Sequence, residues 1–198
     1  MPPSVDLVVR RSGQAGDYRQ CTEWQAGLGP ALEQEDPDVV LLSSASYSTT
    51  GAEAMAAGLR ARVEWIDDEL GALPVLVRDV PRAPFDVPAC LSDHPDDVPA
   101  CAFPRAEGLA SSGTGHDALA AQLRSLPVID LTDAVCPART CSPIVGGVVV
   151  WRDSNHLSAT YVRSLRGVVE QELLPLVRAA DLRERARGGL DRGGALGS

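Results

Sequence analysis

The sequence lacks a long hydrophobic run, an excess of positive charge and a signal-peptide pattern. No apolar stretch approaches the ~20 residues that a membrane-spanning helix needs. The chain begins Met1-Pro2-Pro3-Ser4, without a basic segment followed by an apolar one. The 18 Lys and Arg against 27 Asp and Glu give a formal net charge of -9, which argues against nucleic acid or an anionic membrane as the main partner. Aromatic residues make up only 4%, so a core must consist mainly of Val, Leu and Ala.

The cysteine spacings of a metal site are also missing. The five cysteines form no Cys-x-x-Cys pair, and no His stands at zinc-site spacing from them, so no structural metal is predicted. Cys90 and Cys101 bracket a loop rich in Pro and Asp, and Cys136 and Cys141 bracket a short polar loop. These pairs predict two disulfides and an oxidising compartment, the alternative being a cytosolic protein with reduced thiols. Cys21 is left unpaired.

Helical and strand-like patterns alternate through most of the chain. Apolar residues at helical spacing predict helices over residues 18–32, 55–70, 116–126 and 161–176. Residues 39–42 form a fully apolar run, typical of a strand covered on both faces. Further strands are predicted at residues 74–80, 127–131 and 147–151, with another candidate at 5–9. The alternation predicts an α/β three-layer fold with a mainly parallel sheet. We expect one domain over residues 1–180, with a long loop at 81–115, and a disordered tail over 181–198.

The most informative stretch follows the last apolar run. Asp153 ends that run, and His156 comes three residues later, just before the last helical pattern. An Asp and a His at this spacing can hydrogen-bond to each other, which leaves the second ring nitrogen free to act as a general base. The pair would then be two thirds of a hydrolase triad. The alternative is an Asp that caps a turn beside a surface His.

The sequence resembles a known family, the extracytoplasmic SGNH domain fused to bacterial acyltransferase-3 (AT3) membrane proteins. The matching segments run in the family's order over roughly residues 2–170. They are Tyr18-Arg19-Gln20-Cys21-Thr22-Glu23-Trp24, Pro37-Asp38-Val39-Val40-Leu41-Leu42-Ser43-Ser44, Asp86-Val87-Pro88-Ala89-Cys90 with Cys101, Cys136-Pro137 to Thr140-Cys141-Ser142-Pro143, and Gly146 to Tyr161.

This resemblance implies a three-layer α/β/α SGNH-hydrolase fold without a cofactor. It implies an activity that moves or removes acyl groups, usually acetyl, on envelope polysaccharide, lipid-linked sugar or peptidoglycan. His156 would be the general base and Asp153 its orienting partner. The expected partners are an acylated carbohydrate and an AT3 membrane domain, and the expected location is extracytoplasmic.

The sequence departs from the family at the nucleophile. The family places a Gly-Asp-Ser motif at the end of the first strand, but no Gly-Asp-Ser occurs here, and Gly16-Asp17-Tyr18 has only its first two residues. The family also has a Cys-Pro-Pro element whose Cys looks like the partner of Cys21, and Met1-Pro2-Pro3 occupies that place. Both departures predict that the first strand and the nucleophile are missing, and that residues 39–42 form an exposed sheet edge.

Other residues are weaker candidates. Ser43, Ser44 and Asn155 are expected to line a substrate pocket, and Ser43, Ser44 or Ser46 could replace the nucleophile. His94 and His116 are interpreted as solvated histidines. Asp93, Asp96 and Asp97 are interpreted as a solvated acidic loop rather than a cation site. Two functions remain: an acyltransferase or esterase domain whose nucleophile lies outside this sequence, and a non-catalytic remnant or carbohydrate-binding module.

Overall fold

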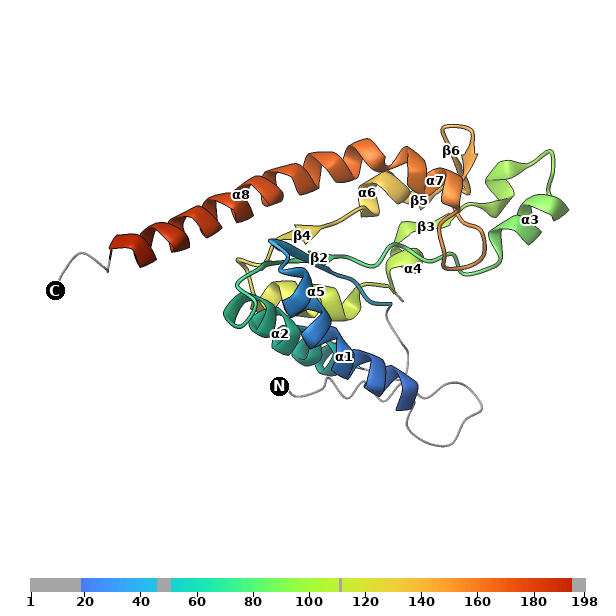
Figure 1. Cartoon of the computed structure of the whole chain (residues 1–198). Helices are drawn as coiled ribbons and strands as arrows, with labels where there is room; N and C mark the ends of the chain where they lie inside the picture. The colour runs from blue at the N-terminus through green and yellow to red at the C-terminus, as the bar shows by residue number, and fades with distance from the viewer. Residues whose placement is uncertain (1–18, 46–50, 111, 194–198) are drawn as a thin grey trace.

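The computed structural model describes residues 19–45, 51–110 and 112–193, so the candidate strand at 5–9 and Ser46 lie outside the described residues. Helices and short strands alternate along the chain (Figure 1). In order they are α1 Arg19–Glu35, β1 Val39–Leu42, α2 Ala52–Asp68, β2 Leu73–Val77, α3 Val87–Asp93, the 3-10 helix η1 Val98–Cys101, β3 Phe103–Pro104, α4 Arg105–Ala110, α5 Thr114–Gln122, β4 Val128–Ile129, α6 Thr132–Val135, β5 Thr140–Cys141, β6 Ile144–Val145, β7 Val148–Val149, α7 Ala159–Ser164 and α8 Arg166–Gly193.

A parallel sheet forms the centre of the molecule. Its described strands lie in the order β1-β2-β4, with Val39 opposite Leu73 and Leu76 opposite Val128. Three of the four predicted parallel strands are therefore confirmed. Within the described residues, β1 pairs with β2 alone, and Leu41 is 48% exposed, as expected of a strand at a sheet edge.

The prediction of a fourth parallel strand at residues 147–151 is wrong. In its place β7 pairs antiparallel with β6 in a hairpin. The turn is Gly146-Gly147, with φ of 58° and 78°, and two successive left-handed residues are what the tight turn of a hairpin requires. The apolar composition of the run was correctly identified, but the two glycines reverse the chain before β7 can join the central sheet.

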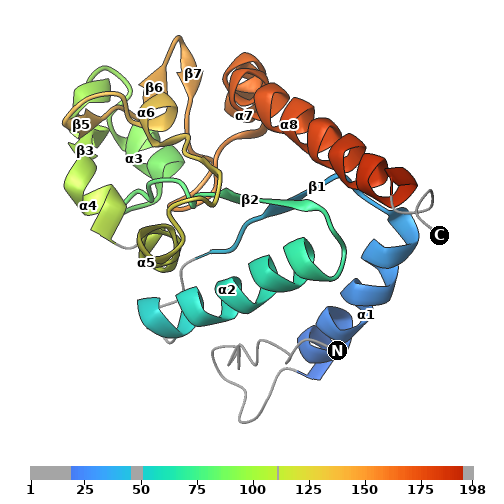
Figure 2. The same cartoon turned by 90° about the vertical axis from the view of Figure 1, so that its left-hand side faces the viewer.

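The sheet is covered on both faces, which confirms the three-layer α/β class. Helices α2 and α5 pack on one face and α8 lies across the other (Figure 2). The apolar side of α2 buries Ala56 and Val63 against Leu76 of the sheet and Leu119 of α5. The layers are built mostly from aliphatic side chains, as the low aromatic content predicts.

A second core lies beyond the end of β2. It includes Val87, Phe103, Val135 and Trp151, and the rings of Phe103 and Trp151 are 5.2 Å apart. The prediction of a long loop at residues 81–115 is therefore wrong, because this segment contains α3, η1, β3 and α4. Residues 81–115 are ordered because their apolar side chains are buried against Trp151.

Within the predicted tail, α8 extends as far as Gly193, and the disorder of this segment stays a prediction. Arg, Glu and Ala favour helix in this segment. Arg185 pairs with Asp181 one turn earlier at 3.0 Å, and Arg183 reaches Asp67 of α2 at 2.6 Å. No helix of the described part is both long and apolar enough to cross a membrane.

Both predicted disulfides, Cys90–Cys101 and Cys136–Cys141, are present. The side chain of Cys21 lies outside the described residues, so its pairing stays a prediction. We expect non-reducing peptide mapping to recover these two bridges, with Cys21 free or bridged between two chains. Reduction should lower the free energy of unfolding by on the order of 2–3 kcal/mol per bridge, because each closes a short loop of 11 or 5 residues. A bridge between Cys21 and any of the other four would contradict the predicted pairing.

Gly113 offers a test of the packing around the side chain of Arg78. It has φ of 68°, and a Cβ there would lie 2.7 Å from the guanidinium carbon of Arg78. We expect Gly113→Ala to lower the free energy of unfolding by about 1–3 kcal/mol in chemical denaturation, through backbone strain and displacement of Arg78. Gly27→Ala is the matched control. It lies in α1 with nothing within 4 Å of the new Cβ, so the change should be neutral or slightly stabilising.

Candidate functional site

Asp153 and His156 form a closed hydrogen-bonded pair on the loop between β7 and α7. One carboxylate oxygen of Asp153 accepts the backbone N–H groups of Asn155 and His156 at 2.8 and 2.7 Å. The other carboxylate oxygen lies 2.8 Å from His156 Nδ1. The main chain closes the loop, since the Arg152 N–H donates to the His156 carbonyl oxygen at 2.9 Å.

This geometry fixes the charge of Asp153 and the ring tautomer of His156. The backbone N–H groups of Asn155 and His156, followed by the His156 side chain, lower the pKa of Asp153 to about 2, so the carboxylate is charged at neutral pH. A carboxylate that faces Nδ1 keeps the ring proton there and leaves Nε2 as the basic nitrogen. The His156 side chain is 58% exposed, so Nε2 can be reached from solvent.

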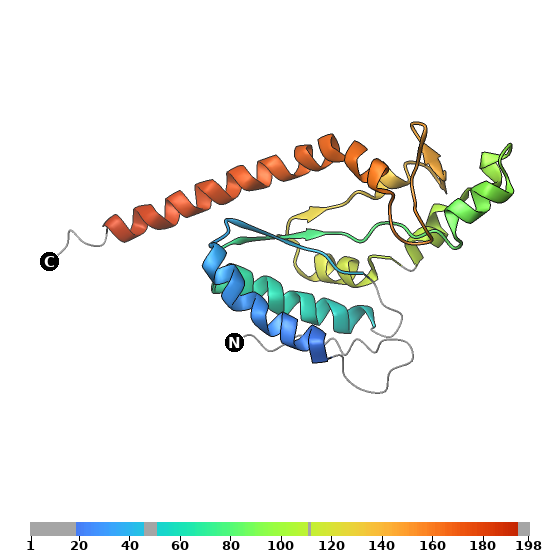
Figure 3. The same cartoon turned by 45° about the vertical axis from the view of Figure 1, so that its right-hand side comes forward.

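The loop is attached to the segment that leaves β2. The Ser154 carbonyl oxygen accepts the Ala83 N–H at 2.7 Å, and the indole N–H of buried Trp151 donates to the Pro81 carbonyl oxygen at 3.0 Å. The loop and the carboxyl ends of β1 and β2 therefore lie at the same end of the sheet (Figures 1 and 3). Ligands of open α/β sheets bind at that end.

A second group of polar side chains occupies the carboxyl ends of β1 and β2. Ser44 Oγ lies 2.9 Å from Nε2 of His116, and the Asp79 N–H donates to Nδ1 of the same ring at 3.0 Å. His116 is 1% exposed, so its interpretation as a solvated histidine is wrong. Burial lowers its pKa, since the charged form loses hydration. Gly113 and Gly115, which allow close packing at the start of α5, were a sequence signal for this burial.

Arg78 lies beneath this group. Its guanidinium makes two bonds of 2.8 Å to the Asp117 carboxylate and further bonds to Thr132 Oγ1 and the Asp79 carbonyl oxygen. The hydrogen bonds to Asp117 raise the pKa of Arg78, so the charge is permanent. A buried cation satisfied by this many acceptors holds α5, and with it His116, against β2.

The remaining predicted site residues are spread out. Ser43 and Asn155 are exposed and Ser44 is half-buried; they follow β1 and lie on the Asp153 loop. A pocket of about 340 Å³ lies at the opposite end of the sheet, between the starts of β1 and β2 and the residues Ala180, Arg183 and Glu184 of α8. No predicted site residue lines it, so it adds nothing to the catalytic hypothesis.

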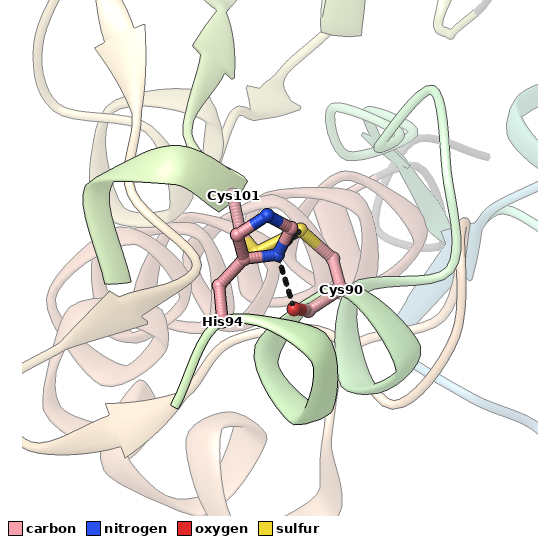
Figure 4. Close-up of side chains that lie close together, drawn as sticks. All are labelled: Cys90, His94 and Cys101. Carbon is pink, nitrogen blue, oxygen red and sulfur yellow. Dashed lines mark hydrogen bonds between the residues drawn. A yellow bond between two sulfur atoms is a disulfide. The ribbon is translucent and has the colours of Figure 1, made fainter. Parts of the chain in front are cut away.

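His94 belongs to a different cluster (Figure 4). Among the described residues, Cys90, His94 and Cys101 form a group whose potential ligand atoms lie within 4.8 Å of one another. The two sulfurs are joined in a disulfide, and His94 Nδ1 lies 3.0 Å from the Cys90 carbonyl oxygen. Oxidised sulfurs are not thiolate ligands, so this arrangement fits a structural bridge better than a metal site.

Comparisons with known proteins agree on the fold. A family model described as the SGNH domain fused to AT3 domains matches residues 1–171. A solved structure, the periplasmic domain of a lipopolysaccharide acetyltransferase from Salmonella ser. Paratyphi A, is similar with a TM-score of 0.51 at 16% sequence identity. The likeness covers 78% of this chain and 66% of that one, slightly less than two thirds of its length. None of the curated proteins matches the chain.

The parallel sheet and its helical layers define an α/β domain of the SGNH type. The chain belongs to the family of SGNH domains that are fused to AT3 domains, which confirms the resemblance noted in the sequence.

The Asp153 environment generates a pH prediction. Its folded pKa of about 2 lies below the usual value of 3.8, so the stabilisation of this loop is complete above pH 4 and is lost as the pH falls towards 2. We expect a ¹³C carboxyl titration by NMR to give a midpoint near 2 for Asp153. Asp153→Asn should make exchange of the Asn155 and His156 amides faster. A midpoint near the usual value would show that the carboxylate does not bind these amides in solution.

Proposed function

We propose that this chain is the His-Asp part of an SGNH acyltransferase or esterase that acts on O-acyl groups, usually acetyl, of cell-envelope carbohydrate. The observation that carries the proposal is the 2.8 Å contact between Asp153 and Nδ1 of His156 on an accessible loop. This contact leaves Nε2 as a base at the end of the sheet where ligands of α/β folds bind. The family membership supports acyl chemistry.

In this scheme a Ser hydroxyl attacks the carbonyl carbon of the acyl group. Nε2 of His156 takes the hydroxyl proton, and Asp153 stabilises the resulting imidazolium. The tetrahedral intermediate collapses, and the leaving sugar oxygen takes the proton from His156. A sugar hydroxyl or water then attacks the acyl-serine, again with His156 as base, which gives transfer or hydrolysis.

The nucleophile of this scheme belongs to a Gly-Asp-Ser motif that this sequence does not contain. Ser44 is a poor replacement, because its hydroxyl lies 2.9 Å from Nε2 of His116, which is buried and is not the proposed base. Ser43 and Asn155, both exposed, are proposed to contact the sugar. The proposed partner is an AT3 membrane domain on the outer side of the membrane, where the two disulfides would be stable.

The absent motif favours a second candidate function, a non-catalytic module that binds carbohydrate or is a remnant of an enzyme. In that case Asp153 and His156 would only close their loop. The two functions differ in whether a supplied nucleophile restores activity that depends on His156.

The test compares this chain with a fusion in which a family segment carrying Gly-Asp-Ser precedes Met1, using p-nitrophenyl acetate. The chain itself should show little or no hydrolysis above buffer. The fusion should hydrolyse the ester, and His156→Ala should lower its kcat about 10³-fold or more, by analogy with other triads. His94→Ala, at an exposed histidine outside the site, is the matched control and should keep the activity.

Activity in the fusion that is unaffected by His156→Ala would exclude the proposed base. Hydrolysis by the chain itself that falls with His156→Ala would show that this sequence holds its own nucleophile, and Ser44→Ala would then be assayed.

A further inference from the structure

His116 is a buried ionisable group that the scheme above does not use. Both of its ring nitrogens are engaged, one by the Asp79 N–H and the other by Ser44 Oγ. His116 is in the first turn of α5, and this end of the helix lies at the same end of the sheet as the Asp153 loop (Figure 3).

The contacts settle which nitrogen carries the proton. A backbone N–H can only donate, so Nδ1 of His116 must be its acceptor and must be bare. A neutral imidazole then carries its hydrogen on Nε2 and donates it to Ser44 Oγ. The charged groups that face the ring are Arg78, Asp79 and Asp117. Burial, with a smaller contribution from Arg78, lowers the pKa of His116, and the opposing carboxylates of Asp79 and Asp117 do not reverse this direction.

The hydrogen bond from His116 determines what Ser44 can do. Since the ring donates to Oγ, the hydroxyl hydrogen of Ser44 points away from His116. In the described residues it meets Met55 Sδ at 3.9 Å, which is a weak acceptor. Ser44 therefore presents a polarised donor that a stronger acceptor, such as a carbonyl oxygen, can take over. Ser44 also cannot lose its proton to His116, because Nε2 already carries one.

We propose that His116 is a positioning residue that makes Ser44 a hydrogen-bond donor to the carbonyl oxygen of the acyl group. The inference rests on the proposed function, since it assumes an acyl substrate at this end of the sheet. Such a donor would stabilise the negative charge that develops on that oxygen during attack. The chain thus contributes both a base and part of the oxyanion site to the reaction.

Two substitutions separate the roles of the ring nitrogens. His116→Gln places an amide N–H near the position of Nε2 and can still donate to Ser44. His116→Asn places an amide oxygen near the position of Nδ1, so it keeps the bond from Asp79 and loses the donor to Ser44. A merely structural role would be served better by Asn, whereas the proposed role is served only by Gln.

The first measurement is the tautomer of His116 in the ¹⁵N-labelled chain at pH 7, by long-range ¹⁵N–¹H correlation. We expect the Nε2–H form, with the exposed His94 measured beside it for comparison. An Nδ1–H ring or an imidazolium overturns the proposal. This measurement needs neither substrate nor nucleophile, so its result does not depend on the fusion assay. A fusion that fails to hydrolyse p-nitrophenyl acetate refutes the proposed function and leaves the tautomer result unchanged.

The second measurement is the infrared carbonyl band of methyl 6-O-acetyl-glucoside, ¹³C-labelled at the carbonyl, mixed with the chain. The band should gain a lower-frequency component with the unmodified chain and with His116→Gln. Ser44→Ala and His116→Asn should lose it, while His94→Gln should keep it. The proposal is overturned if the unmodified chain gives no such component, or if Ser44→Ala or His116→Asn retains it. Thermal unfolding of each variant confirms that it is folded.

Discussion

The arrangement of the candidate site depends on the hydrogen bonds of one extended segment, residues 78–83, where the chain leaves the parallel sheet. The Arg78 N–H still donates to the Ile129 carbonyl oxygen of β4 at 3.0 Å. After it the chain leaves the sheet, so its polar backbone groups bond elsewhere. The Asp79 N–H binds the His116 ring, the Pro81 carbonyl oxygen accepts the Trp151 indole, and the Ala83 N–H binds the Ser154 carbonyl oxygen. One short stretch of main chain therefore holds both α5 and the Asp153 loop at the same end of the sheet.

Ion pairs also hold residues 78–83 in place. Arg78 is bound by Asp117 on one side, and Arg82 binds Asp79 at 3.0 Å on the other. A buried guanidinium is costly to dehydrate, and this cost is offset only if its acceptors stay in place. The position of α5, and with it the histidine ring, is thereby made specific.

The local features of this chain could be predicted from its sequence, and the long-range ones only in part. The strand at residues 39–42 and the Asp153–His156 pair depend on neighbouring residues, so composition and spacing were enough to identify them. The hairpin of β6 and β7 was missed because an apolar run does not reveal its partner strand. The contact between Ser44 and His116 joins residues 72 positions apart, and nothing local in the sequence points to it.

The positions of the two disulfides have a consequence for the order in which the chain folds. Each bridge joins cysteines only 11 or 5 residues apart, so closing it costs little chain entropy. The pairing of Val39 with Leu73 must instead bring together segments separated by a whole helix, which is slow. Both bridges can therefore close before the sheet exists. Oxidation then yields the native pairing by proximity, independently of whether the central strands have assembled.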